Sequence, residues 1–452
     1  MGRWSNRSTV ALLIVLAACG NGVTAASPSE PAIVTTSSGP AVTPSPAYQA
    51  PTTERGCSPP SGEPFTTNAS AQVTPIGQGS DGVGLLEAVV YPRPEYRGRP
   101  WTAWGQGVVI GDGRFFSAIG DHLGAEGNSY VYEFDPSSGT LTEIGDVRQL
   151  VGPTTWGYGK VHGQMVSGPC GEVYFSTYWG DKPGGETLDA YEGDFLLRID
   201  PESDQIEALG SPVPGYGVPS LAGATGLGLV YGEAVDPAIE PKDGPFFAYD
   251  VAAEAVVYAS PEADDHQGFR NIAVDRSGKA YFSGADYRLL VFDPATNQVT
   301  DYPGQLPGKW LRASTQPAPD GTIYAATREP DMLFSFTPEG TVTTLGPAPD
   351  YVASLAMHPD GTRFFYIPSA HGKSWQLGAP LMEVNIATGE QRVLVELNPL
   401  GESELGLSFG GTYGIVADPG GERLYVVMNS GVPENVRDAA FGEVVLVVIH
   451  LV

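Results

Sequence analysis

The feature that most constrains the fold is a recurring unit of four short strands. The third strand of each unit ends in a turn, which reads Phe134-Asp135-Pro136, Ile199-Asp200-Pro201, Tyr249-Asp250-Val251, Phe292-Asp293-Pro294, Phe336-Thr337-Pro338 and Val384-Asn385-Ile386. Asp250 and Asp293 are 43 residues apart, and Asp293 and Thr337 are 44 residues apart. A period of about 40–50 residues with four strands per unit is typical of β-propellers, in which each unit forms one blade.

A second turn, between the first and second strands of the unit, recurs in step with the first. It ends in Gly and reads Gly111-Asp112-Gly113, Gly168-Pro169-Cys170-Gly171, Asp275-Arg276-Ser277-Gly278, Pro319-Asp320-Gly321, Pro359-Asp360-Gly361 and Asp418-Pro419-Gly420-Gly421. Gly is favoured at such turns because it accepts a positive φ. The strand after each turn alternates aromatic and small residues, and no helical period competes with this pattern.

Seven units can be counted, and the seventh lacks its outer strand because the chain stops at Val452. Residues 71–77 resemble the outer strands of other units, for example residues 140–145 and 341–346. The sequence therefore predicts an all-β fold, a seven-bladed β-propeller of four-stranded blades, closed by residues 71–77 pairing with the C-terminal strand. Closure matters because an open sheet edge invites aggregation.

These blade motifs resemble the broad group of bacterial propellers that includes the SMP-30/gluconolactonase-like, YVTN and virginiamycin-lyase-like proteins. The resemblance covers about residues 71–452. It implies the fold and leaves the function open, because blade motifs recur in propellers of unrelated function. The chain does not contain a complete set of catalytic residues from any one of these families, so none is transferred to it.

The N-terminus predicts export. Arg3 and Arg7 precede the apolar run from Thr9 to Leu16, which is too short to span a bilayer, since spanning takes about 20 residues. The following Leu16-Ala17-Ala18-Cys19-Gly20 resembles the lipobox of bacterial lipoproteins, in which signal peptidase cuts before the Cys and the Cys thiol carries the lipid. The alternative is an ordinary cleavable signal with an accidental Cys.

We therefore expect a signal peptide at 1–18, a lipid-anchored tether at 19–56 and the propeller at 57–452. The tether is rich in Ala, Ser, Thr and Pro, a composition that buries too little apolar surface to fold. This organisation places the protein outside the cytoplasm, held to a membrane through lipid on Cys19. Because export leads to an oxidising compartment, we also expect a disulfide between Cys57 and Cys170, with two separate thiols as the alternative.

The chain is strongly acidic, with a formal net charge of −28. Nucleic-acid binding needs a basic face, so this balance argues against it. No pair of His residues has the spacing of a zinc protease and no EF-hand loop occurs, so we predict no particular metal site or cofactor.

The candidate functional residues lie at the starts of the inner strands, which face one mouth of the propeller channel. Seven to nine residues before the Gly that ends the turn between the first and second strands, the chain places Trp104, His162, Gln164, Arg270, Asn271, Arg312 and Tyr413, with Trp310, Trp156 and Tyr158 nearby. Arg270 and Arg312 favour a carboxylate or sulfate, because a guanidinium binds such groups bidentately. His162 and Tyr413 are able to move a proton and are the candidate catalytic residues.

Each of these residues also has a structural interpretation. His162 could bond to a neighbouring blade, the two arginines could pair with acids such as Asp265 and Asp286, and the tryptophans could pack between blades.

Two functions are compatible with the candidate residues. The first, which we favour, is binding of a small ligand, glycan or protein at the channel mouth. The second is a lyase or hydrolase acting on an anionic sugar.

Overall fold

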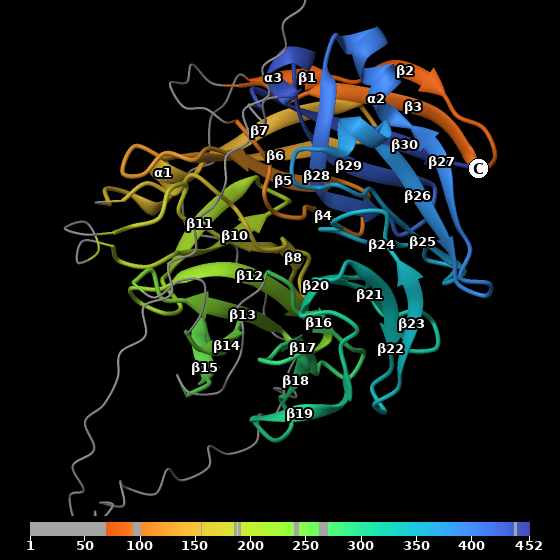
Figure 1. The fold of residues 1–452 in the computed structure, drawn as a ribbon. Coiled ribbons are helices and arrows are strands. Elements are labelled where there is room, and N and C mark those ends of the chain that lie inside the picture. The colour runs from red at the N-terminus through yellow and green to blue at the C-terminus, as the bar shows by residue number, and fades with distance from the viewer. Residues whose placement is uncertain are drawn as a thin grey trace, which may run out of the picture. The chain divides into compact units, whose positions relative to one another are not determined.

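The computed structural model describes residues 69–93, 101–154, 156–184, 188, 191–238, 244–261, 270–437 and 441–452. In this part of the chain, seven antiparallel sheets are arranged as a seven-bladed β-propeller, as predicted (Figure 1). The predicted signal peptide, Cys19, Cys57 and the tether lie outside the described residues, so the anchor and the Cys57–Cys170 disulfide stay predictions.

Blades 1 to 4 each contain four consecutive strands, with the innermost strand first. They consist of β4 (Val108–Val109), β5 (Phe115–Gly120), β6 (Ser129–Asp135) and β7 (Thr140–Asp146); β8 (Val166–Ser167), β9 (Val173–Ser176), β10 (Leu196–Asp200) and β11 (Gln205–Gly210); β12 (Gly217–Ala224), β13 (Leu229–Val235), β14 (Phe246–Asp250) and β15 (Ala255–Ala259); and β16 (Ala273–Val274), β17 (Ala280–Ser283), β18 (Arg288–Asp293) and β19 (Gln298–Gln305). The predicted inner turns lie between the first two strands, where Gly113 has a φ of 94°.

Blades 5 and 6 keep the same order, and blade 7 takes strands from both ends of the chain. They consist of β20 (Trp310–Ser314), β21 (Ile323–Arg328), β22 (Met332–Phe336) and β23 (Val342–Pro347); β24 (Ala356–Met357), β25 (Arg363–Tyr366), β26 (Pro380–Asn385) and β27 (Gln391–Glu396); and β28 (Ser408–Ala417), β29 (Arg423–Gly431), β30 (Glu443–Leu451), β3 (Val83–Val90) and β2 (Thr74–Gln78).

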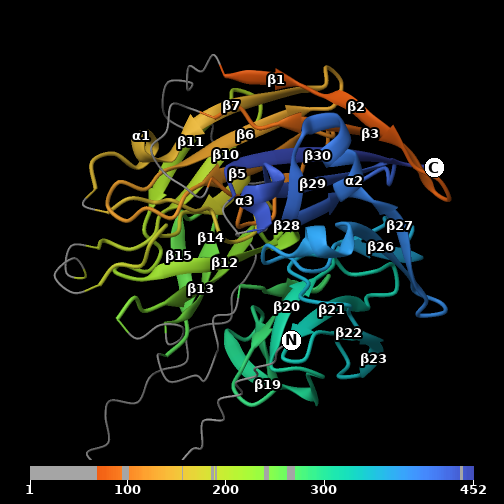
Figure 2. The same cartoon turned by 45° about the horizontal axis from the view of Figure 1, so that its top comes forward.

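An N-terminal strand closes the ring, but it is not the one that the sequence suggested. β3 pairs with β30, from Val83 opposite Leu451 to Val90 opposite Val445. Residues 71–77 instead cover the end of β1 (Ser70–Gln72), which extends blade 1 beside β7, and most of β2, the fifth strand of blade 7 (Figure 2). The reason is burial: β3 has four buried side chains and β2 has one, so the more apolar strand takes the inner position.

Aromatic side chains of the second and third strands form the core between neighbouring blades. Phe246 of blade 3 stacks on Phe282 of blade 4 with ring centroids 4.4 Å apart. Helices are short in the described chain and consist of α1 (Val147–Val151), α2 (Leu397–Leu400), α3 (Pro433–Arg437), the 3₁₀ turns Thr225–Leu227 and Ser374–Leu377, and a π-helical turn at Gly401–Leu405. None of the helices in this part of the chain is long and apolar enough to cross a membrane.

Candidate functional site

Three spaces follow one another along the propeller channel. The first, here the channel cavity, has a volume of about 330 Å³. Its lining comes from the inner strands, mainly residues 106–109, 164–167, 272–274, 314–316, 355–357 and 415–417. No ionisable side chain is among its described lining residues.

The second space, here the neck, is much smaller and lies at the strand starts. It has a volume of about 10 Å³ and is lined by Trp104, Gln106, His162, Gln164, Arg270, Asn271, Arg312, Ala353 and Tyr413. Seven of the eight ligand-binding and catalytic candidates therefore converge here, as the alignment of the inner strands predicted. The remaining candidate, Trp310, lines none of the three spaces. It begins β20 opposite Arg328, and the Nζ of Lys309 lies 4.5 Å from its ring centroid.

The third space, here the mouth cavity, has a volume of about 250 Å³. It is lined by Trp104, His122, Ala370, His371, Gly372, Tyr413, Asn429 and Phe441. Trp104 and Tyr413 belong to both the neck and the mouth cavity, so the two spaces adjoin.

A belt of hydrogen-bonded side chains lies between the neck and the channel cavity. The Gln164 amide nitrogen donates to Asn271 Oδ1 (3.1 Å), and Asn271 Nδ2 donates to Ser314 Oγ (3.0 Å). On the other side of the ring, Gln106 Nε2 donates to the carbonyl of Ile415 (3.2 Å), whose amide donates to Ser354 Oγ (3.1 Å). This polar belt joins the inner strands of several blades.

Arg312 is only 3% exposed, and it interacts with aromatic rings rather than with an acid. Its Nε donates to the hydroxyl of Tyr351, and its guanidinium carbon lies 5.2 Å and 5.7 Å from the ring centroids of Tyr351 and Tyr413. Burial, with Arg270 nearby, lowers the pKa of Arg312. No described carboxylate, Asp286 included, forms a salt bridge with Arg270 or Arg312, while Asp265 lies outside the described residues.

Arg270 has an unusual backbone conformation, with a φ of 75°. Such a φ is unfavourable for a residue other than Gly and costs about 1–3 kcal/mol. Strained residues of this kind cluster at functional sites, where the surrounding structure holds them in place. The conformation of Arg270 and its position at the neck therefore both support a functional role for this residue.

His162 is 4% exposed, and a single hydrogen bond determines its tautomer. Nδ1 lies 3.0 Å from the carbonyl oxygen of Pro219, which can only accept, so Nδ1 carries the proton. Burial lowers the pKa of His162 well below its usual value, with Arg270 adding to the effect. The ring is therefore neutral, and Nε2 is a buried acceptor without a hydrogen-bond partner in the described chain.

The mouth cavity is built around the ring of Trp104. Its centroid lies 4.7 Å from that of His122, 5.0 Å from that of Tyr413 and 6.1 Å from that of His371. The Nζ of Lys160 lies 4.8 Å from the same ring, a distance at which a cation is attracted to the π face. Burial, together with Lys160 and Arg270, lowers the pKa of His122 to about 3, so this ring is neutral near pH 7.

Tyr413 and His371 form a direct hydrogen bond between two proton-carrying groups of the mouth cavity. The Tyr413 hydroxyl and His371 Nδ1 share a hydrogen bond of 2.5 Å. Burial raises the pKa of Tyr413 and lowers that of His371, so both groups are neutral near pH 7. Tyr413 is 4% exposed, whereas His371 is accessible from solvent.

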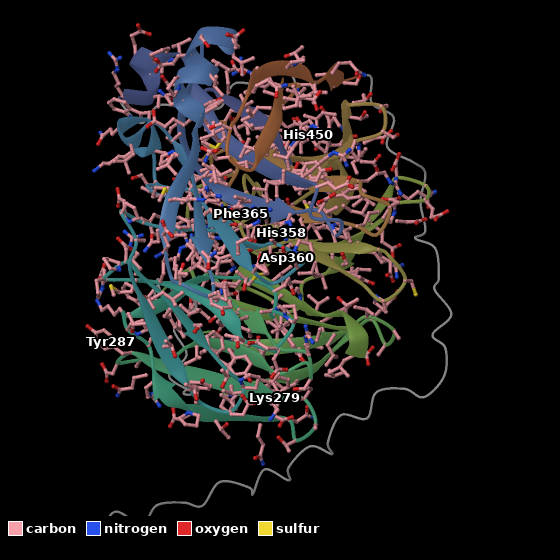
Figure 3. The ribbon with its side chains drawn as sticks, turned by 90° about the vertical axis from the view of Figure 1, so that its right-hand side faces the viewer. Lys279, Tyr287, His358, Asp360, Phe365 and His450 are labelled. Carbon is pink, nitrogen blue, oxygen red and sulfur yellow. The ribbon has the colours of Figure 1, made fainter. Side chains whose placement is uncertain are left out.

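Several residues of the site were not among the ligand-binding and catalytic candidates, although the sequence offered His122 and His371 as weaker, possible metal ligands. Lys160 lies two residues before His162 in the sequence, and this proximity could have marked it as a further candidate. His122, His371 and Phe441 come from the loops between the second and third strands of blades 1, 6 and 7, and these loops differ in length. Two other histidines lie elsewhere: His358 contacts Asp360 (2.8 Å) beside the inner turn of blade 6, and His450 contacts Glu87 (2.8 Å) on the closing strands (Figure 3).

The two remaining aromatic candidates are core residues. Trp156 and Tyr158 are buried in the cluster that joins blades 1 and 2, and the Tyr158 hydroxyl donates to the carbonyl of Gly193 (2.8 Å). Cys170 lies in the exposed turn between β8 and β9. In the described chain, no group of three or more His, Cys, Asp or Glu residues has a geometry that could hold a metal ion.

The fold is similar to that of solved propellers at low sequence identity. A streptogramin B lyase matches with a TM-score of 0.52 and 10% identity, over 81% of this chain and 98% of that chain. A catalytically inactive virginiamycin B lyase from Staphylococcus aureus, solved with quinupristin, matches with a TM-score of 0.50 and 10% identity, over 80% of this chain and 99% of that chain. The WD40 repeats of RRP9 match with a TM-score of 0.49 and 12% identity, over 81% and 97% of the two chains.

The similarity to the two lyases shows the fold and nothing finer, because one fold can serve unrelated functions. The predicted resemblance to virginiamycin-lyase-like propellers is thereby confirmed at the level of architecture. No protein-family model matches the sequence, and neither does any curated protein.

Proposed function

We propose that this propeller binds a small organic anion that carries a ring, at the mouth cavity. The observation that carries the proposal is the pair Arg270 and Arg312 at the neck, with which no described carboxylate forms a salt bridge. Arg312 is buried and Arg270 is partly buried, so both guanidinium groups would be stabilised by a negative charge nearby. In a chain of net charge −28, a cationic hollow is a local exception that attracts an anion.

The other lining residues favour a ring-shaped ligand of modest size. Trp104 and Phe441 offer aromatic surface, to which sugar rings and flat apolar groups bind. The volume of about 250 Å³ is below the range of roughly 300–1,000 Å³ that is usual for drug-sized ligands. A sugar acid or a small aromatic acid suits both the size and the charge.

The test is calorimetric titration with matched charged and neutral ligands. D-glucuronate and mandelate are compared with glucose and benzyl alcohol, and we expect the carboxylates to bind at least about tenfold more tightly. Arg270→Gln should remove that preference. Arg276→Gln is the matched control, because Arg276 lies at the opposite end of the inner strand and donates to the carbonyl of Ala318. Equal affinity for charged and neutral ligands would contradict the proposal.

A second candidate function is a lyase acting on the same kind of anion, and the Tyr413–His371 hydrogen bond favours it. In such an elimination a base removes the proton next to the carboxylate, the C–O bond at the next carbon breaks, and an acid returns a proton to the departing oxygen. Tyr413 and His371 are neutral groups suited to these transfers. Incubation with uronate oligosaccharides should yield an unsaturated product that Tyr413→Phe fails to form, while binding is retained.

We also propose that the chain is exported and anchored through lipid on Cys19, with the propeller outside the cytoplasm. The lipobox-like segment around Cys19 supports this. Fractionation of cells should recover the wild-type protein with membranes and Cys19→Ala without them. Mass measurement with and without reductant tests the Cys57–Cys170 disulfide in the same material.

A further inference from the structure

The neck is a space for one atom. Its volume of about 10 Å³ is close to the roughly 10–15 Å³ that a single water molecule requires. A carboxylate or sulfate group is too large to enter. The neck therefore suits a single oxygen atom or an ion of similar size.

The lining of the neck contains both hydrogen-bond donors and an acceptor. Arg270 and Arg312 can only donate hydrogen bonds. Nε2 of His162 can only accept, because Nδ1 holds the proton of this neutral ring in its bond to Pro219. The Nε2 atom is buried and has no partner within the described residues.

An occupant that satisfies both sides must accept and donate at the same time. A hydroxyl group does so, with lone pairs for the guanidinium groups and a proton for Nε2. A halide or a carboxylate oxygen lacks that proton, and its charge would face the Nε2 lone pair. Burial makes the match important, because an unpaired buried polar atom is costly.

We propose that the neck is a hydroxyl subsite, so that the ligand of the mouth cavity is a hydroxy acid whose hydroxyl group enters the neck and accepts from Arg312 while donating to His162. This inference rests on the proposed binding of an organic anion and narrows its chemical class. The ring and the carboxylate then stay in the mouth cavity, beside Trp104 and within the field of Lys160 and Arg270.

The first experiment compares mandelate with phenylacetate, which differ by one hydroxyl group. The wild-type protein should prefer mandelate by at least about tenfold. His162→Phe keeps an aromatic ring of similar shape but lacks the acceptor, so its preference should fall to near unity. A preference that is the same in both proteins, or absent from the wild type, would overturn the hydroxyl subsite while leaving anion binding intact.

The second experiment needs no ligand and no folded variant other than the wild type. Nitrogen-15 NMR of histidine-labelled protein reports the tautomer of each ring, and His162 should be neutral with its proton on Nδ1 near pH 7. A doubly protonated ring, or a proton on Nε2, would overturn the inference and indicate a site for a bare anion. Failure of all carboxylates to bind, with the Nδ1 tautomer observed, would count against the proposed function alone.

Discussion

The neck and the mouth cavity at one end of the channel differ in chemistry from the channel cavity, although the neck and the channel cavity are lined by the same inner strands. The channel cavity is lined by neutral side chains such as Met165, Val166 and Ser314. A few residues earlier on the same strands, His162 and Arg312 introduce charge and hydrogen-bonding groups. The repeat thus builds one channel, and side chains at the strand starts, joined by loops, turn one end of it into a site. This agrees with the general tendency of function to lie where loops meet a rigid scaffold.

The polar belt makes the difference between the two cavities sharper. It separates a cationic, aromatic space from a neutral one by a layer of amide and hydroxyl groups. A ligand that enters the mouth therefore meets the neck as a floor, and the channel cavity behind it remains distinct.

The largest expected effect is loss of both cavities together when the ring is opened. Ending the chain before Val444 removes β30, which pairs with β29 on one side and β3 on the other. We expect no cooperative unfolding transition for this protein, because blade 7 loses its central strand and leaves unpaired edges. Circular dichroism and thermal melting measure this. A truncated protein that melts cooperatively would show that the cavities do not depend on ring closure.

Arg312→Met should weaken binding at the mouth and leave the fold nearly as stable. Affinity for the organic anion should fall roughly 10- to 100-fold, since a charged hydrogen bond contributes about 1.5–3 kcal/mol. The free energy of unfolding should stay within about 1 kcal/mol of the wild-type value, because removal of a buried charge offsets the lost contacts of Arg312 with Tyr351 and Tyr413. Calorimetry and denaturant titration measure the two effects. A loss of stability by about 3–5 kcal/mol would instead reveal a broken buried ion pair.

Asn271→Ala tests the belt that separates the two cavities. The change leaves Gln164 Nε2 and Ser314 Oγ without the partner that Asn271 supplies, so the free energy of unfolding should fall by about 1–3 kcal/mol. Gln316→Ala is the control, because this exposed amide also lines the channel cavity but takes no part in the belt, and its effect should stay within about 0.5 kcal/mol. Equal effects in urea titrations would mean that the belt does not stabilise the neck.

Much of the site could be predicted because it lies on the repeating part of the chain. Residues at the same distance before the Gly of each inner turn lie at the same height in the channel. Counting back from that Gly therefore placed His162, Arg312 and Tyr413 together at the neck. Trp310 lies outside the site because it is two residues further back on β20, beyond the level of the neck. The loop residues His122 and His371 could not be placed, since the loops between second and third strands differ in length from blade to blade.

The closing strand shows a different limit of sequence reasoning. Residues 71–77 do form outer strands, and their pattern was recognised correctly. The pattern of one segment does not show which of two adjacent segments, β2 or β3, will pair with β30. β3 pairs with β30 because its side chains Val83, Leu86, Ala88 and Val89 become buried there. This burial is a property of the assembled blade.

The smallest expected effect concerns the pH dependence of stability, which should separate the two cavities again. The pKa of His122 in the folded protein is lowered to about 3, whereas the unfolded chain binds this proton near pH 6.5. Between these values the unfolded state holds more protons, so the stability that neutral His122 contributes is complete above pH 6.5 and is lost as the pH falls toward 3. Relative to His122→Gln, the wild-type protein should lose less than about 1.4 kcal/mol per pH unit in this window, because partial exposure of the ring reduces the effect.

Met165→Leu is the matched change in the channel cavity, whose described lining carries no ionisable side chain. Its difference in unfolding free energy from the wild type should be the same at every pH between 4 and 8, a window of about four units around the ordinary pKa of His. Urea titrations at intervals across this range give both curves. A pH-independent difference for His122→Gln would mean that His122 titrates as it does in water, and the mouth cavity would then be far wetter than its lining residues imply.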